Sequence, residues 1–251
     1  MKMNKTSSAV RRGRLLANAF GAAPRLRGEG GFTIIELFVS IGIIFILLAL
    51  AGAGIASALS KAQMNGTMNN AHQLYLAQFS MANDGMSTDA TGLAWAGDYA
   101  PALTLLEDYI NKLVRPGYLK GGDVAKLLSA PGCNLRVNVN NGPPASVTFL
   151  PGSMSALKVH PVQDRDPANT IFATSRNYVY DTAINGSAVP YGPKGFIVVR
   201  KGGDANVFNS RQATVAGWGN DQTKFQSNIG LKHGDNPGTV TPNDPANTLI
   251  Y

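Results

Sequence analysis

A long apolar stretch, residues 32–59, constrains this chain more than any other feature. Glu36 is the only charged residue between Glu29 and Lys61. An α-helix rises 1.5 Å per residue, so the stretch would extend roughly 42 Å, more than a hydrocarbon core of about 30 Å. We therefore expect residues 32–59 to form a transmembrane helix. A carboxylate inside it costs roughly 2.5–3.5 kcal/mol even on lenient insertion scales, so Glu36 is expected to have a partner.

The positive charge is concentrated before this stretch. The chain has a formal net charge of +7, and residues 1–31 account for +6 of it, with seven basic residues and one acidic residue: Lys2, Lys5, Arg11, Arg12, Arg14, Arg25, Arg27 and Glu29. This bias predicts a cytoplasmic N-terminus and an exported C-terminus. The rest of the chain carries only +1, so bulk charge gives no case for nucleic-acid binding.

Gly31, Phe32, Thr33 and Glu36, followed by hydrophobic residues, carry a resemblance to a known family. They resemble the class III signal of type IV pilins and type II secretion pseudopilins, and the resemblance covers residues 1 to about 84. It implies that a prepilin peptidase cuts after Gly31 and that the new amino terminus, Phe32, is methylated. It also implies that Glu36 pairs with the amino terminus of a neighbouring subunit during assembly.

The resemblance implies a structural fibre subunit and no enzymatic activity. Its expected partners are copies of itself or other pseudopilins, the prepilin peptidase and an inner-membrane assembly platform. The expected location is the bacterial inner membrane, with a single pass and the head in the periplasm or in a surface-exposed fibre. Cys133 is the only cysteine, so the paired-cysteine loop of many small pilins is excluded, which favours a pseudopilus over an adhesive pilus.

Four other interpretations of residues 1–59 compete with this one. A cleaved secretory signal has an apolar core of 7–15 residues, about half the length found here. A twin-arginine signal at Arg11-Arg12 would lie about twenty residues from the apolar stretch. A plain uncleaved anchor leaves Glu36 unexplained. The alternative from a different functional class is a membrane-tethered periplasmic domain that binds carbohydrate or protein and never polymerises. The mature N-terminus separates this tether from a fibre subunit.

The pattern after Leu59 predicts that the helix continues in amphipathic form over residues 60–84. Apolar side chains recur at steps of three or four, which is helical spacing, at Met64, Met68, Ala71, Tyr75, Phe79 and Ala82. Asn83-Asp84-Gly85 then has the chemistry of a turn. We therefore expect one helix from Thr33 to about Asn83, with one stripe buried against a head domain.

Residues 85–251 are expected to form that head, with an α+β fold in which the long helix packs on an antiparallel sheet. A helical face over residues 103–113 is expected to begin near Pro101, and Asp123 is expected to cap a short helix over residues 124–128. The strand candidates are residues 135–139 and 146–150, which form a hairpin, and residues 177–180, 196–200 and 249–251.

Signals for catalysis or metal binding are weak. The three histidines, His72, His160 and His233, lie far apart and match no zinc motif. No cofactor is expected, with calcium as the one candidate. Major pseudopilins hold calcium near the C-terminus, and the loop of residues 234–247 offers four oxygen-bearing side chains: Asp235, Asn236, Asn243 and Asp244. These residue types are also ordinary turn formers.

Overall fold

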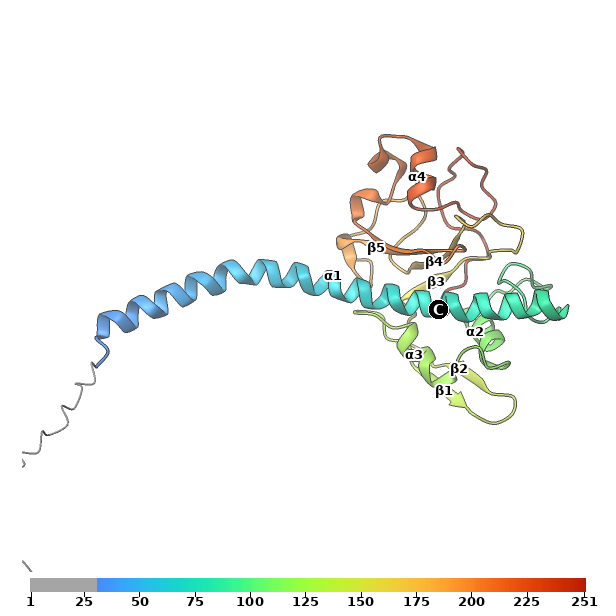
Figure 1. Ribbon diagram of the computed structural model, residues 1–251, viewed down its shortest axis with the longest axis horizontal. Coiled ribbons are helices and arrows are strands. Elements are labelled where there is room, and N and C mark those ends of the chain that lie inside the picture. The colour runs from blue at the N-terminus through green and yellow to red at the C-terminus, as the bar shows by residue number, and fades with distance from the viewer. Residues whose placement is uncertain (1–30) are drawn as a thin grey trace, which may run out of the picture. The chain divides into compact units, whose positions relative to one another are not determined.

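The computed structural model describes residues 31–251 (Figure 1). Residues 1–30, which hold almost all of the predicted leader, lie outside the described residues, as do the side chains at positions 51–54 and 56. The chain divides into two compact units, Met1–Ala49 and Leu50–Tyr251, and each is treated by itself below.

The predicted long helix is confirmed as α1, Ile34–Thr88. It ends five residues later than expected: Gly85 lies inside the helix, where the backbone of Leu93 packs against it, and does not start a turn. A Cβ atom on Gly85 would lie 1.8 Å from the carbonyl oxygen of Leu93. The helix ends at Thr88, and the positive φ of 54° at Asp89 turns the chain away. Among the helices of residues 31–251, none combines the length and the apolar character that crossing a membrane requires.

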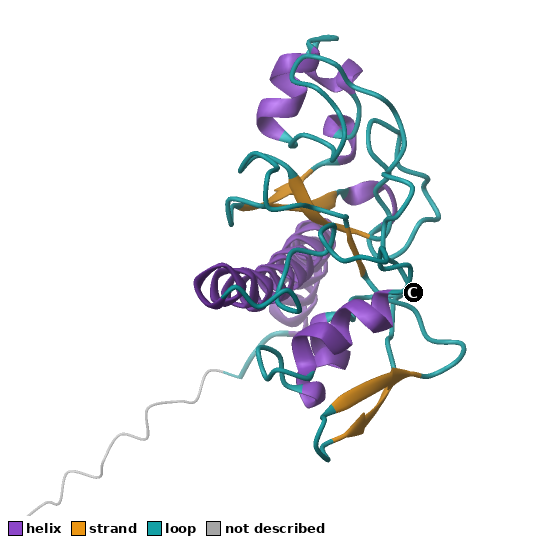
Figure 2. Ribbon diagram, turned by 90° about the vertical axis from the view of Figure 1, so that its right-hand side faces the viewer, coloured by secondary structure: helices purple, strands orange, loops and turns teal. Residues whose placement is uncertain are grey.

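In the second unit, α1 lies between two sets of elements, so its buried stripe is wider than predicted. A four-stranded sheet and α4 lie on one side, and α2, α3 and a hairpin lie on the other (Figures 1 and 2). Met64, Ala71, Tyr75 and Ala82 are buried as expected, and Met68 is partly buried. Phe79 was wrongly assigned to the stripe and is 46% exposed.

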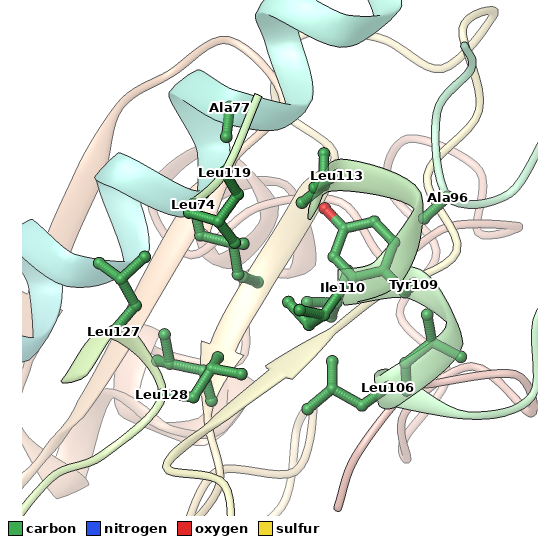
Figure 3. Close-up of a cluster of buried hydrophobic side chains, with 14 of the residues drawn as sticks. Leu74, Ala77, Ala96, Leu106, Tyr109, Ile110, Leu113, Leu119, Leu127 and Leu128 are labelled. Carbon is green, nitrogen blue, oxygen red and sulfur yellow. The ribbon is translucent and has the colours of Figure 1, made fainter. Parts of the chain in front are cut away.

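The side of α1 opposite the sheet packs on α2, Leu106–Val114. Leu74 and Ala77 of α1 belong to one cluster with Ile110 and Leu113 of α2 (Figure 3). The predicted helical face is therefore confirmed, but the helix starts at Leu106 and the prediction that Pro101 begins it is wrong.

A short helix and a hairpin complete this side. A 3-10 turn, η1 (Gly121–Asp123), leads into α3, Val124–Leu127, as predicted, although Asp123 makes no side-chain cap. Strands β1, Val137–Asn140, and β2, Ser146–Phe149, pair in antiparallel fashion, which confirms the predicted hairpin. The Asn111 side chain of α2 holds β2 in place, donating to the Val147 carbonyl at 2.9 Å and accepting from the Val147 amide at 2.8 Å.

The main sheet is antiparallel in the order β3-β4-β5-β6: Leu157–Val159, Ile171–Ser175, Phe196–Arg200 and Ala205–Phe208. Of these strands only β5 was predicted. Strands β3 and β4 are buried at every position, so they lack the alternation that marks a half-buried strand. The strands expected at residues 177–180 and 249–251 are wrong. The first is a turn, and Leu249 makes an isolated bridge to Val159.

Both faces of this sheet are covered. On one face Phe172 packs edge-on against Tyr75 of α1, with ring centroids 5.8 Å apart. On the other face Phe196 and Val198 pack with Phe225 of α4, Gln222–Asn228. The remaining short helices are η2 (Gly192–Lys194), η3 (Ser210–Gln212) and η4 (Val215–Trp218). The expected α+β fold, with a long N-terminal helix on antiparallel sheets, is confirmed.

This packing predicts that a fragment of residues 57–251 folds without the preceding chain. All core clusters of the described residues lie within it, and its size is that of an ordinary domain. It should show near-ultraviolet circular dichroism and a cooperative thermal transition. A control fragment of residues 89–251 lacks α1 and should stay largely unfolded, because Leu74, Tyr75 and Met81 no longer fill the core. A disordered 57–251 fragment would contradict the prediction.

Candidate functional site

The predicted cleavage site is exposed, and the described fold does not require glycine at position 31. Gly31 is exposed, its φ lies outside the left-handed region, and a Cβ atom added to it would meet nothing within 4 Å. Phe32 follows with 84% of its surface exposed. The described fold therefore gives no packing reason for a glycine at position 31, whereas a protease subsite that accepts only small side chains would require one.

Glu36 has a partner in its own chain that the sequence analysis missed. Its Oε2 atom accepts hydrogen bonds from the amide and the hydroxyl of Thr33, both at 2.9 Å. The Thr33 hydroxyl in turn accepts from the Glu36 amide at 3.3 Å. This reciprocal arrangement is a capping box, which satisfies free donors at the start of a helix. The Thr-x-x-Glu spacing was visible in the sequence and was the signal that could have revealed it.

The capping box opens a segment of α1 whose apolar side chains are exposed. Beyond Phe32 they include Ile34, Ile35, Leu37, Phe38, Val39, Ile41, Ile43, Ile44, Phe45, Ile46, Leu47, Leu48 and Leu50. The Ser40 hydroxyl, one turn further along, donates to the Glu36 carbonyl at 2.7 Å. An apolar surface of this extent is expected to be covered by lipid or by another protein chain.

The calcium candidate in the head does not fit the structure, because lysine ammonium groups already hold its carboxylates. Asp244 forms an ion pair with Lys158. Asp235 lies 3.4 Å from Lys232 and accepts from the Thr241 hydroxyl at 2.5 Å. Within residues 31–251 no group of three His, Cys, Asp or Glu side chains is placed to hold a metal ion. The charge that calcium would supply is supplied by two ammonium groups.

The two asparagines named as calcium candidates in that loop serve its backbone. Asn243 adopts a positive φ of 77°, a conformation that asparagine tolerates better than most residues. Its amide donates to the Tyr180 carbonyl at 2.9 Å. The Asn236 carbonyl accepts from the Gln226 side chain at 3.2 Å. Both asparagines therefore act as ordinary turn formers, which was the alternative to calcium binding for this loop.

Lys158 and Asp244 form a buried ion pair, with 4% and 16% of their side chains exposed. Lys158 also donates to the Tyr178 carbonyl, and Asp244 accepts from the Tyr180 amide at 3.1 Å. Burial alone would raise the pKa of Asp244, but the charges of His160 and Lys158 and the hydrogen bonds outweigh it and lower that pKa. The sequence did not reveal this pair, because 86 positions separate its members.

His160 lies beside this pair and is fully buried. Its Nε2 atom lies 3.2 Å from the Thr174 hydroxyl. Burial is the main cause that lowers its pKa from 6.5 to about 4. His160 is therefore neutral at neutral pH, and Lys158 is then the charged partner of Asp244. His233, the other histidine of this region, lies 2.7 Å from Asp166 through its Nδ1 atom.

The lowered pKa of His160 predicts an acid-sensitive head. Between pH 6.5 and 4 the unfolded chain binds a proton at this site and the folded chain does not, so stability falls as pH falls. The loss should reach roughly 3 kcal/mol in the free energy of unfolding. Urea unfolding across this pH range measures it. His160→Gln should remove this share of the pH dependence, whereas His72→Gln should retain it. An unchanged pH profile in His160→Gln would refute the assignment.

No protein-family model, curated protein or solved structure matched this chain in three comparisons.

Proposed function

We propose that this chain is a structural subunit of a type II secretion pseudopilus or a related type IV pilus-like fibre. In this proposal a prepilin peptidase cuts between Gly31 and Phe32, and the apolar half of α1 anchors the chain in the bacterial inner membrane. The subunit then assembles with copies of itself or other pseudopilins on an inner-membrane platform. The head faces the periplasm or the outside of the fibre.

The observation that carries the proposal is the exposed apolar segment of α1 that starts at Phe32. Among the residues that the structure describes, none covers these side chains, so the segment requires an environment of lipid or of equivalent helices. A fibre subunit uses both environments in turn, first as a membrane anchor and then as the fibre core. We infer the anchor from the amino-acid sequence of residues 32–59. The structure does not describe the side chains at positions 51–54 and 56 of this range.

The open geometry at Gly31 and the position of Glu36 also support the proposal. A Cβ atom at position 31 would meet nothing within 4 Å, so the described fold places no demand for glycine there, and recognition by a peptidase would account for it. Cleavage would create an ammonium group at Phe32, one residue before the capping box. The carboxylate of Glu36 is held at that end of the helix by Thr33. It is therefore positioned to pair with an amino terminus, either its own or that of a neighbouring subunit.

Substitution of Gly31 tests the processing step. Gly31→Leu should prevent maturation, because a large side chain cannot enter a subsite for small residues. Gly31→Ala is the matched control and should retain much of the cleavage. Mass spectrometry of the membrane fraction identifies the N-terminus in each variant. If the Gly31→Leu protein has Phe32 as its N-terminal residue at the wild-type yield, the proposed cleavage after Gly31 by a peptidase with a small subsite is wrong.

The same measurement separates the fibre subunit from a tethered binding domain. An N-terminus at methylated Phe32 favours assembly. A wild-type protein that keeps residues 1–31 in the membrane would favour the tether.

A further inference from the structure

A groove in the second unit lies where α1 leaves its apolar segment. It has a volume of about 750 Å³ and lies between residues 57–65 of α1, the end of β6 and the short helix η3. Its apolar lining comes from Met64, Val207 and Phe208. Strand β6 is an edge strand of the main sheet, so no further strand covers this side. We refer to this feature as the α1–β6 groove.

The rim of the α1–β6 groove is basic. Lys61 lies two residues after the apolar stretch, and Lys194 comes from η2. Both side chains are exposed, and the Lys194 ammonium donates to the Ser60 hydroxyl at 2.7 Å, which fixes it over α1. Among the described side chains that line the groove none is acidic, and the other polar ones are neutral. Two ammonium groups above an apolar floor match an amphiphile with an anionic head.

We propose that the α1–β6 groove binds an anionic phospholipid, with its phosphate between Lys61 and Lys194 and the start of its acyl chains on Met64, Val207 and Phe208. This inference rests on the membrane anchor proposed above. If residues 32–59 lie in the bilayer, the groove starts at the membrane surface, where phosphate groups are concentrated. Lysines near that surface attract anionic lipids. Lipid bound there would hold the head of an unassembled subunit at the membrane.

The test compares lipid selectivity of the full chain in nanodiscs that contain both phosphatidylglycerol and phosphatidylcholine. Native mass spectrometry reports which lipid remains bound after release from the nanodisc. Lys61→Gln with Lys194→Gln should lower the retained ratio of phosphatidylglycerol to phosphatidylcholine by about fivefold for each lysine. The matched control, Lys120→Gln with Lys126→Gln, removes the same charge from exposed lysines outside the groove and should retain the wild-type ratio.

Asn209→Asp provides a variant that keeps every neighbouring lysine. Asn209 lines the groove and caps η3 by accepting from the Arg211 amide, a role that aspartate also performs. The new carboxylate should lower the same lipid ratio without loss of folding, which circular dichroism checks.

Four results would overturn the inference. The first is an unchanged lipid ratio in the Lys61–Lys194 double variant, and the second is an equal fall in the control pair. The third is binding of inorganic phosphate alone, in detergent without lipid, with the same dependence on the two lysines. The fourth is a loss of cross-links between subunits in the double variant without any lipid, which would assign the groove to a second copy.

If the chain fractionates as a soluble protein, the proposed anchor fails as well. A membrane-bound chain without lysine-dependent selectivity overturns this inference alone.

Discussion

If the chain is the fibre subunit proposed above, Glu36→Gln is expected to abolish fibre assembly while cleavage after Gly31 and membrane insertion continue. Glutamine can still accept from the Thr33 amide, so the capping box and the first turn of α1 are retained. The substitution removes the negative charge, and the ammonium group of Phe32 then has no counter-charge in the apolar layer. Membrane insertion should continue, because the free-energy cost of placing a carboxylate in the apolar layer is larger than that of placing a neutral glutamine there.

Three roles of Glu36 give three different outcomes. If it pairs with an amino terminus, both Glu36→Gln and Glu36→Ala accumulate as mature subunits without fibre. If it serves only peptidase recognition, both variants accumulate uncut and show no separate assembly defect. If it serves only the capping box, Glu36→Gln assembles normally and Thr33→Ala fails, because loss of a cap costs about 1 kcal/mol.

The measurement quantifies mature subunit and sheared fibre from the same cells. Thr33→Ser keeps the hydroxyl and is the control for Thr33→Ala. A normal yield of fibre from fully processed Glu36→Gln protein would refute the charge-pairing role.

Lys158→Met is expected to lower the free energy of unfolding of the head by about 3–5 kcal/mol, because it leaves a buried carboxylate without its partner. Asp244 would keep its hydrogen bond from the Tyr180 amide but lose the ammonium group. Urea unfolding of the 57–251 fragment, followed by the fluorescence of buried Trp95, measures the change. Lys158→Met with Asp244→Asn should recover part of the loss, because the unpaired charge is then removed.

The same ion pair predicts that calcium has little effect on the head. The melting temperature of the wild-type fragment should be the same with calcium and with a chelator, since Lys158 and Lys232 occupy the carboxylates of the loop. A clear rise in the melting temperature with calcium would contradict this assignment. Normal stability of Lys158→Met would show that the pair contributes less than its burial implies.

The features that could be predicted from the sequence are those with a local pattern. The body of α1, the α2 face at Leu106, Ile110 and Leu113, and the β1–β2 hairpin each carry their periodicity within a few neighbouring residues. The prediction of a processing and assembly site at Gly31, Phe32 and Glu36 likewise rests on one short segment, and it stays a prediction. The Thr33–Glu36 capping box was equally local and was missed, although the spacing was available.

The remaining features depend on contacts between distant parts of the chain. Strands β3 and β4 are buried on both faces because α1 covers one side and the α4 layer covers the other, which erases their alternation. Gly85 remains inside α1, where Leu93 packs against it, and the helix continues past the predicted turn to Thr88. Lys158 and Asp244 lie far apart in sequence, and each alone resembles an ordinary charged residue. Only the folded chain brings them together in a buried site, where an ion pair replaces the calcium that the loop composition suggested.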